Sequence, residues 1–307
     1  MEGVKIFSGK SHRELAEKVC EKLGIALSDL KIEEFKNGCF EPILGEDIKG
    51  KIVFLFQTSR SDNRDLHKDI WELFQIINAA KSSGAKEVIV IMPYASYARS
   101  DKVHAPGMGI CAELLIKLLE SSGMTGFIGI DFHSGKFEKF FSTEVYQLSA
   151  LDLLAEALKG INPKISFLLP ADMGALKNGS ILAEKLGITV GQVEKERISD
   201  TEVRIKRITG DFSGKDVIIF DDEISTGATL KTLAKEIEDK AKSISFAVTH
   251  GIFVGDSIKN FQEIKKLKEI ISTDTVPASK ELRESLPLRV ITVAGLLAQK
   301  IKEVCKI

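Results

Sequence analysis

The amino-acid sequence predicts an α/β protein in which mainly parallel sheets are flanked by helices. Short runs of apolar, often β-branched residues alternate with amphipathic patterns of helical period along the 307 residues. Strands that are apolar throughout, rather than at every second position, are typical of parallel sheets covered on both faces. Polar motifs directly follow several of these runs, as expected where ligands bind beyond the carboxyl ends of parallel strands.

The first half of the chain contains three apolar runs that we expect to be strands, with helical patterns between them. The expected strands cover 51–58, 87–94 and 126–134, and the expected helices cover 69–85 and 109–123. The first helical pattern ends near Gly84, which suits a helix C-terminus because glycine readily adopts the left-handed conformation found there.

The same rhythm restarts after a helical pattern at 148–160. Further strands are expected at 165–172, 216–223 and 243–251, and further helices at 176–187 and 227–240. Two such series suggest two α/β domains with similar plans. We place the domains at 1–147 and 148–307, and we allow the last helix to pack on the N-terminal domain.

Bulk composition limits the possible classes of function. A formal net charge of -1 creates no overall field that would attract nucleic acid or an anionic membrane. No apolar run approaches the roughly 20 residues that span a bilayer, and the N-terminus does not resemble a signal peptide. The cysteines form no CxxC pair, which suits a reducing cytoplasm. We therefore expect a soluble cytoplasmic protein without nucleic-acid or membrane partners. The cysteines are Cys20, Cys39, Cys111 and Cys305.

The segment "IIFDDEISTGATL" (218–230) carries the strongest functional pattern. Asp221 and Asp222 follow an apolar run, and a turn of small hydroxyl residues with Gly227 precedes the next helix. The backbone N–H groups of such a turn and the positive end of the helix dipole favour a phosphate. The two acids can accept hydrogen bonds from hydroxyls or hold a cation, so a sugar phosphate satisfies both ends. If the acids only capped the helix, two adjacent carboxylates would lack a partner.

Together, the motifs resemble the ribose-phosphate pyrophosphokinase (phosphoribosyl-diphosphate synthetase) family. The acidic pair and the turn look like the phosphoribosyl-diphosphate loop of the type I phosphoribosyltransferase fold, so the resemblance implies two phosphoribosyltransferase-like domains. Other blocks match the family in order and over nearly the whole length. They are "FKNG" (35–38), "PYASYARSD" (93–101), "DFHSGKFEKFF" (131–141), "ADMGALK" (171–177), "VEKER" (193–197), "VTHGIF" (248–253), "STDTVP" (272–277) and "LRVITVAGLLAQKI" (288–301).

The resemblance implies an enzyme that transfers the diphosphoryl group of ATP to the anomeric hydroxyl of ribose 5-phosphate, giving phosphoribosyl diphosphate and AMP. It also implies Mg²⁺ as the cofactor, since reactants with about six negative charges must be brought together. In the family the active site lies between the two domains of a homo-oligomer, which we expect here as well.

Functional positions of the family can be carried over where this sequence matches them. Lys195 and Arg197 match a catalytic pair on a mobile flap, and His133 and Asp172 match metal positions. In the family, adenine contacts can come from a neighbouring subunit. The expected ATP-binding residues are Phe35, Asn37, Arg99, Asp101 and His133. The expected ribose 5-phosphate-binding residues are Asp221, Asp222, Ser225, Thr226, Gly227, Ala228 and Thr229.

Some of these residues also have plainer explanations. A histidine that follows a strand, such as His133, can pack against its neighbours or cap a helix without binding a ligand. Charges like those around Lys195 are usually solvated surface, and an aromatic residue such as Phe35 is usually core.

Departures from the family pattern gather on the nucleotide side. Cys39 stands where a glutamate is usual, Ser100 replaces a glutamine, and the 102–113 segment departs from a stretch with basic residues. They leave open a catalytically weak or inactive regulatory homologue that binds nucleotide or sugar phosphate. A salvage phosphoribosyltransferase would explain the loop but would leave the N-terminal domain without a role.

Overall fold

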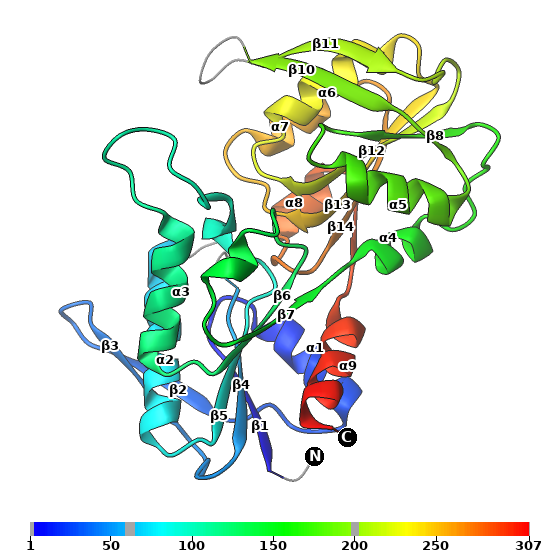
Figure 1. The fold of residues 1–307 in the computed structure, drawn as a ribbon. Coiled ribbons are helices and arrows are strands. Elements are labelled where there is room, and N and C mark those ends of the chain that lie inside the picture. Colours follow the sequence, from blue (N-terminus) through cyan, green and yellow to red (C-terminus); the bar gives the residue numbers. More distant parts are fainter. Residues whose placement is uncertain (1–2, 59–64, 198–202, 307) are drawn as a thin grey trace. The chain divides into compact units, whose positions relative to one another are not determined.

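The computed structural model describes residues 3–58, 65–197 and 203–306 (Figure 1). The chain divides into two compact units. Unit 1 comprises Met1–Leu148, Thr275–Pro277 and Thr292–Ile307, and unit 2 comprises Ser149–Asp274 and Ala278–Ile291. The chain therefore leaves unit 1 after residue 148 and ends in it again.

The described strands of unit 1 form a parallel sheet in the order β1–β4–β5–β6–β7. Consecutive residues of one strand, such as Phe54 and Leu55, point to opposite faces and are both buried, because helices cover both faces of the sheet. The parallel sheet confirms the predicted fold class. The strands are β1 (Val4–Ser8), β4 (Ile52–Phe56), β5 (Glu87–Ile91), β6 (Gly126–Ile130) and β7 (Glu144–Leu148).

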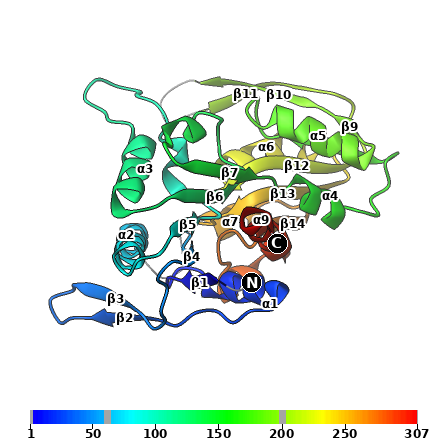
Figure 2. The same ribbon diagram turned by 60° about the horizontal axis from the view of Figure 1, so that its bottom comes forward.

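Four helices pack on this sheet in two pairs. α2 and α3 lie together on one face, and α1 and α9 lie together on the other (Figures 1 and 2). Two short 3₁₀ turns, η1 (Ser96–Arg99) and η2 (Phe137–Phe140), follow β5 and β6. The helices are α1 (Arg13–Leu23), α2 (Leu66–Ser82), α3 (Cys111–Ser122) and α9 (Ala294–Cys305).

An antiparallel hairpin, β2 (Leu30–Glu34) and β3 (Phe40–Leu44), projects from unit 1 beyond α2 (Figure 2). Its turn end is attached through Glu34, whose Oε1 accepts from Lys10 Nζ at 2.8 Å and from Lys68 Nζ at 3.5 Å. The Lys68 ammonium also lies 5.7 Å from the centre of the Phe40 ring. The sequence patterns did not indicate this hairpin, because neither strand has the apolar run that marks the strands of the sheet.

The described strands of unit 2 form a second parallel sheet in the order β15–β14–β13–β12–β8–β9. Ile218 packs in the core with α4 and α5, whereas the next residue, Ile219, packs in the core with α6 and α7. The strands are β8 (Ser166–Pro170), β9 (Thr189–Val190), β12 (Asp216–Ile224), β13 (Ser243–Gly251), β14 (Leu267–Thr273) and β15 (Leu288–Ile291). The helices are α4 (Leu151–Ala157), α5 (Leu176–Leu186), α6 (Ala228–Glu238), α7 (Ser257–Gln262) and α8 (Lys280–Ser285).

A second antiparallel hairpin, β10 (Gln192–Arg197) and β11 (Val203–Thr209), belongs to unit 2 and precedes β12 in the chain. Its register shifts between Glu194 and Lys195. Throughout the described parts of both units, every helix is too short or too polar to cross a membrane.

Candidate active site

The carboxyl ends of β8 and β12 bring three carboxylates into one neighbourhood. The two strands pair in parallel up to Pro170 and Phe220, so Asp172 and Asp221 follow on adjacent strands. Burial and then the charges of Asp222 and Asp172 raise the pKa of Asp221 well above its ordinary value. The backbone N–H of Asp222 donates to Asp221 Oδ1 at 2.9 Å but only partly opposes this rise. Such surroundings attract a proton or a cation.

The two acids lie inside β12, as the strand predicted at 216–223 requires. β12 continues to Ile224 because it keeps pairing with the long strand β13, from Asp221 opposite Val248 to Ile224 opposite Gly251. The acids are therefore held on regular backbone, immediately before the predicted phosphate loop.

The predicted phosphate loop, residues 225–229, connects β12 to α6. Gly227 is the N-cap of α6 with φ at +71°, and no side chain among the described residues caps this helix. A Cβ at Gly227 would lie 2.6 Å from the ring of Phe261, so a glycine is required. Ala228 N–H lies 3.4 Å from Thr226 Oγ1, a weak interaction. A helix start with exposed hydroxyls and no capping side chain is suited to bind an anion.

The predicted catalytic pair lies on the β10–β11 hairpin. Lys195 pairs with Ile205 and is partly buried, and the backbone of Arg197 pairs with Val203. The side chain of Arg197 lies outside the described residues. Alternate residues of a strand share a face, so the backbone of β10 allows both side chains to act on the same group, and their catalytic role stays a prediction.

Three of the predicted nucleotide residues, Arg99, Asp101 and His133, lie on two loops of unit 1 that a hydrogen bond joins. Arg99 ends η1 behind β5, and His133 follows β6, both with exposed side chains. Ser134 Oγ donates to Oδ2 of the buried Asp101 at 2.5 Å, which ties the two loops together. Ser134 was not predicted as a functional residue, although its hydroxyl stands in the same block as His133.

The backbone is strained two residues before His133. Asp131 is a buried residue with φ at +38°, in a region that residues with a side chain rarely adopt. Its N–H donates to the carbonyl oxygen of Leu148 at 2.9 Å, which helps to hold this conformation. Strain of this kind concentrates at functional sites.

Phe35 and Asn37 lie at the turn of the β2–β3 hairpin. Phe35 is 46% exposed, so it is not a core residue of this chain. Asn37 Oδ1 accepts from the Cys39 N–H at 3.0 Å and so shapes the turn. In Figures 1 and 2 this turn lies beyond α2, apart from the carboxyl ends of β5 and β6.

The carboxylates of Asp172, Asp221 and Asp222 match the binding preferences of Mg²⁺ in part. The described residues contain no group of three or more His, Cys, Asp and Glu side chains arranged to hold a metal ion. Mg²⁺ does not require such a group, because it usually binds one or two carboxylates together with water and substrate phosphates. Asp172 and the acid pair offer the oxygen ligands that it prefers, and burial together with the neighbouring charges of Asp222 and Asp172 raises the pKa of Asp221. These residues fit Mg²⁺ bound together with a substrate, whereas the nitrogen of His133 is a less usual ligand.

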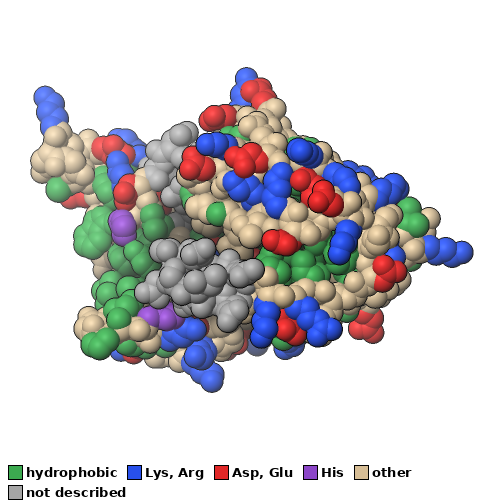
Figure 3. Space-filling model, turned by 90° about the horizontal axis from the view of Figure 1, so that it is seen from above, with side chains coloured by type: hydrophobic (Ala, Val, Ile, Leu, Met, Phe, Trp, Pro, Cys, Tyr) green, Lys and Arg blue, Asp and Glu red, His purple; other side chains and the backbone are tan. Residues whose placement is uncertain are grey.

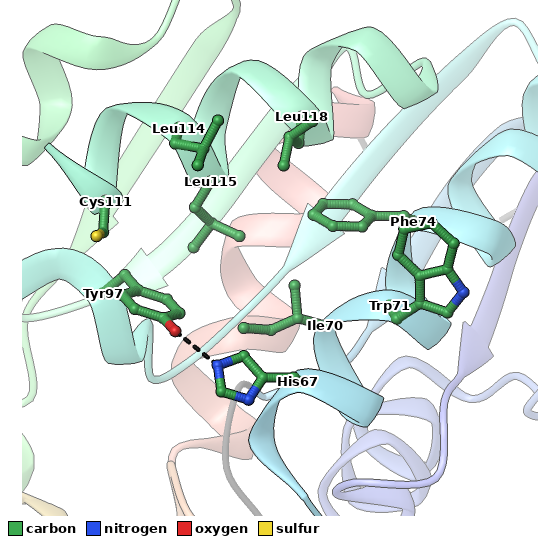
Figure 4. A pocket seen from close by; sticks show the side chains of 9 residues that line it. All are labelled: His67, Ile70, Trp71, Phe74, Tyr97, Cys111, Leu114, Leu115 and Leu118. Atoms are coloured by element: carbon green, nitrogen blue, oxygen red, sulfur yellow. Dashed lines mark hydrogen bonds between the residues drawn. The ribbon is translucent and has the colours of Figure 1, made fainter. Parts of the chain in front are cut away.

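An apolar groove of about 310 Å³, which the sequence patterns did not reveal, lies between α2 and α3 (Figure 4). Trp71, Leu114 and Leu118 on its walls are 58%, 58% and 43% exposed. Hydrophobic side chains gather on this part of unit 1 in the space-filling view (Figure 3). At the polar end, His67 Nε2 lies 2.8 Å from the hydroxyl of Tyr97, and Tyr97 belongs to η1 with Arg99. The groove and the predicted nucleotide loop therefore share one element.

Comparison with known proteins places the chain in a family. The description "N-terminal domain of ribose phosphate pyrophosphokinase" matches residues 4–123, and "phosphoribosyl synthetase-associated domain" matches residues 184–306. A ribose-phosphate pyrophosphokinase of Deinococcus radiodurans is 36% identical over 304 residues, which cover 97% of this chain and 94% of that relative. The chain belongs to the ribose-phosphate pyrophosphokinase family.

Other members of the ribose-phosphate pyrophosphokinase family agree with this assignment. A putative ribose-phosphate pyrophosphokinase of Streptomyces coelicolor is 32% identical over 305 residues, 99% of this chain and 95% of the relative. The crystal structure of the phosphoribosylpyrophosphate synthetase from Mycobacterium smegmatis superposes with a TM-score of 0.90 at 28% identity, covering 99% of both chains. The predicted family and fold class are thus confirmed.

Proposed function

We propose that this member of the family is an active ribose-phosphate pyrophosphokinase, which converts ribose 5-phosphate and ATP into phosphoribosyl diphosphate and AMP. The order of groups along β12 and the start of α6 carries this proposal: two acids, then exposed hydroxyls, then a helix without a side-chain cap. Ribose 5-phosphate has hydroxyls at one end and a phosphate at the other. Units 1 and 2 then correspond to a nucleotide domain and a sugar-phosphate domain.

In this proposal, Asp221 and Asp222 accept hydrogen bonds from ribose hydroxyls, and residues 225–229 bind the 5-phosphate. Hydroxyl donors can offset the desolvation that raises the pKa of Asp221. The phosphate gains from the backbone N–H groups and from the dipole of α6. Each part of the sugar phosphate therefore meets a group of complementary polarity.

The proposed reaction joins the anomeric oxygen to the β-phosphorus of ATP. As that bond forms, the bond between the β-phosphorus and the oxygen of the α-phosphate breaks, and AMP leaves. In such reactions the protein mainly positions the reactants and neutralises developing charge. We assign the neutralising role to Lys195 and Arg197. ATP-binding roles go to Phe35, Asn37, Arg99, Asp101 and His133.

Mg²⁺ is the proposed cofactor, and Asp172 and His133 are the protein positions that we assign to it. When bound, it would supply positive charge to the phosphates of the nucleotide. Asp172 Oδ1 already accepts the backbone N–H of Ala175 at 3.0 Å, which orients the carboxylate. All four cysteines are free, in keeping with a reducing compartment, and we propose the cytoplasm as the location.

The test is chromatography of mixtures of the purified chain, ribose 5-phosphate, Mg²⁺ and, in turn, ATP, GTP or CTP. With ATP, we expect AMP and phosphoribosyl diphosphate in equal amounts. The preferred donor will show what Cys39 and Ser100 change on the nucleotide side. Absence of product with every donor, while ribose 5-phosphate still raises the melting temperature, would contradict the enzyme and favour the regulatory homologue.

We also propose that the chain forms a homo-oligomer in which a second copy covers the α2–α3 groove. The walls of the groove are apolar and aromatic, as in the cores of protein interfaces. In a symmetric contact, groups near the two-fold axis face the same groups of the second copy, so charged groups there would repel each other. Trp71, Leu114 and Leu118 carry no charge and therefore avoid this repulsion. The turn that carries Phe35 and Asn37, the proposed adenine-contacting residues, lies beyond α2 in Figures 1 and 2, so a second copy could also complete the nucleotide site.

A further inference from the structure

The segment behind β13 supports the predicted phosphate loop from one side. Val254 N–H donates to the carbonyl oxygen of Ser225 at 3.1 Å. Asn260 Nδ2, on α7, donates to the carbonyl oxygen of Thr226 at 2.9 Å. Asn260 is 9% exposed, and its own backbone N–H donates to the carbonyl oxygen of Asp256. Its side chain is therefore a buried donor aimed at the backbone of the loop.

The hydrogen bond from Asn260 fixes the orientation of one peptide group. The described chain contains no cis peptide bond, and in a trans peptide the C=O and the following N–H point in opposite directions. Because the carbonyl group of Thr226 points to α7, the N–H of Gly227 points away from α7. That N–H consequently faces the side of the loop that α7 leaves open.

The backbone alone does not select this orientation. Rotation of the Thr226–Gly227 peptide by half a turn changes mainly ψ of Thr226 and φ of Gly227. Glycine adopts φ of either sign with similar ease, so its present value of +71° does not exclude the reversed form. The reversed peptide would present the carbonyl oxygen of Thr226, which carries partial negative charge, and would repel a phosphate. A side-chain donor is therefore needed to keep the N–H outward.

We propose that Asn260 is a positioning residue of the ribose 5-phosphate site, which holds the Thr226–Gly227 peptide so that the Gly227 N–H faces the 5-phosphate. This inference rests on the proposed function and adds a residue that follows Thr226 by 34 positions in the chain. Asn260 acts through the loop, and its effect is specific to the phosphate end of the sugar.

The experiment measures the Kd of ribose 5-phosphate by calorimetry, and KM and kcat by product formation, in the full chain. Asn260→Ala is expected to raise Kd and KM about tenfold, the scale of one hydrogen bond to a charged group. The kcat should change less than about twofold, because the phosphate contact is present equally in the ground state and the transition state. Asn260→Asp keeps the size of the side chain but replaces the donor by an acceptor, so its Kd should rise at least as much.

Gln262→Ala is the matched control. Gln262 lies on the same helix, and its Nε2 also donates to a backbone carbonyl oxygen, that of Ser285, at 3.3 Å. Its removal should leave Kd, KM and kcat unchanged. If Asn260 were only structural, its variants would lower the melting temperature and the folded fraction but leave the Kd of the folded protein unchanged, which would overturn the inference. A wild-type chain that does not bind ribose 5-phosphate would overturn the proposed function as well.

Discussion

At the scale of single residues, we expect Asp221 to favour the binding of ribose 5-phosphate but to lower the stability of the folded chain at neutral pH. Burial, Asp222 and Asp172 raise its pKa above the ordinary 3.8, so the folded state holds the proton more tightly than the unfolded state. As pH rises above that ordinary value, the unfolded state loses its proton first, and the free energy of unfolding falls. We expect Asp221→Asn to raise the melting temperature at pH 7 by about 2–4 °C, a shift typical of 1 kcal/mol. The gain should shrink as pH falls toward the ordinary pKa, and ribose 5-phosphate should bind more weakly. Thermal unfolding over a pH series, with calorimetry, measures both effects.

Asp216, at the start of the same strand, provides the control with the opposite sign. Burial tends to raise its pKa, but the hydroxyl of Ser243, which donates to Asp216 Oδ1 at 2.7 Å, and the ammonium of Lys242 together lower it. Asp216→Asn should therefore lower the melting temperature at pH 7 and leave sugar-phosphate binding intact. If both Asp221→Asn and Asp216→Asn lowered the melting temperature, the destabilisation that we expect from the ionised Asp221 carboxylate would be contradicted.

The sequence alone predicted some single residues of the candidate site and missed others for a physical reason. Asp221, Asp222 and Gly227 are neighbours in the chain, so a strand, a turn and a helix in succession were enough to bring them together. Asn260 forms a hydrogen bond with Thr226, which lies 34 positions away in the sequence. Ser134 forms one with Asp101, which lies 33 positions away. Only tertiary packing creates such pairs, and an asparagine on a short helix has no pattern that reveals its partner.

At the scale of elements, the β10–β11 hairpin allows a separate test of catalysis. Lys195 follows the register shift of β10 and belongs to a strand that, among the described residues, pairs with β11 alone. We expect Lys195→Ala to lower kcat about 100-fold or more, because a fixed positive charge would be lost from the transition state. The Kd of ribose 5-phosphate should stay within about twofold, since the phosphate loop is a different element. Product formation at saturating substrates and calorimetry distinguish the two quantities.

Lys206, an exposed lysine on β11, is the matched position for this test. Lys206→Ala removes the same charge from the same hairpin and should leave kcat unchanged. Equal losses of kcat in both variants would point to the net charge of the hairpin rather than to Lys195, and an unchanged kcat in Lys195→Ala would reject its catalytic assignment.

Elements differed in how well the sequence predicted them. Strands such as β4 and β13 were predicted because burial on both faces leaves a continuous apolar run. The hairpin strands β2 and β3 pair mainly with each other and keep one face open, so their residues are mixed. β12 was predicted at 216–223 and ends one residue later, at Ile224, because pairing with β13 continues through the acids.

At the scale of the whole molecule, the proposed homo-oligomer depends on the groove between α2 and α3. Leu118 is 43% exposed on α3, and Leu118→Glu would place a charge in each half of a symmetric apolar contact. We expect the variant to shift toward the monomer mass in light scattering at micromolar concentration, because an unpaired charge is costly to bury. If the second copy supplies Phe35 and Asn37, the KM for ATP should rise in the same variant.

Ile181 on α5 is 36% exposed, does not line the groove and gives the corresponding control. Ile181→Glu should leave the mass and the KM for ATP unchanged. A wild-type chain that is already a monomer at this concentration would refute the proposed contact, and loss of assembly without any change in KM would separate assembly from the nucleotide site.

The return of the chain to unit 1 has a consequence for the order of synthesis. α9 packs with α1, yet the residues of unit 2 lie between the two helices in the sequence. A nascent chain is made from its N-terminus at about 5–20 residues per second, so α1 emerges from the ribosome long before its partner. Until residues 294–305 are translated, one face of the first sheet lacks part of its cover, while the sheet of unit 2 already has all its strands. In the growing polypeptide, the half that is made first is therefore the half that is completed last.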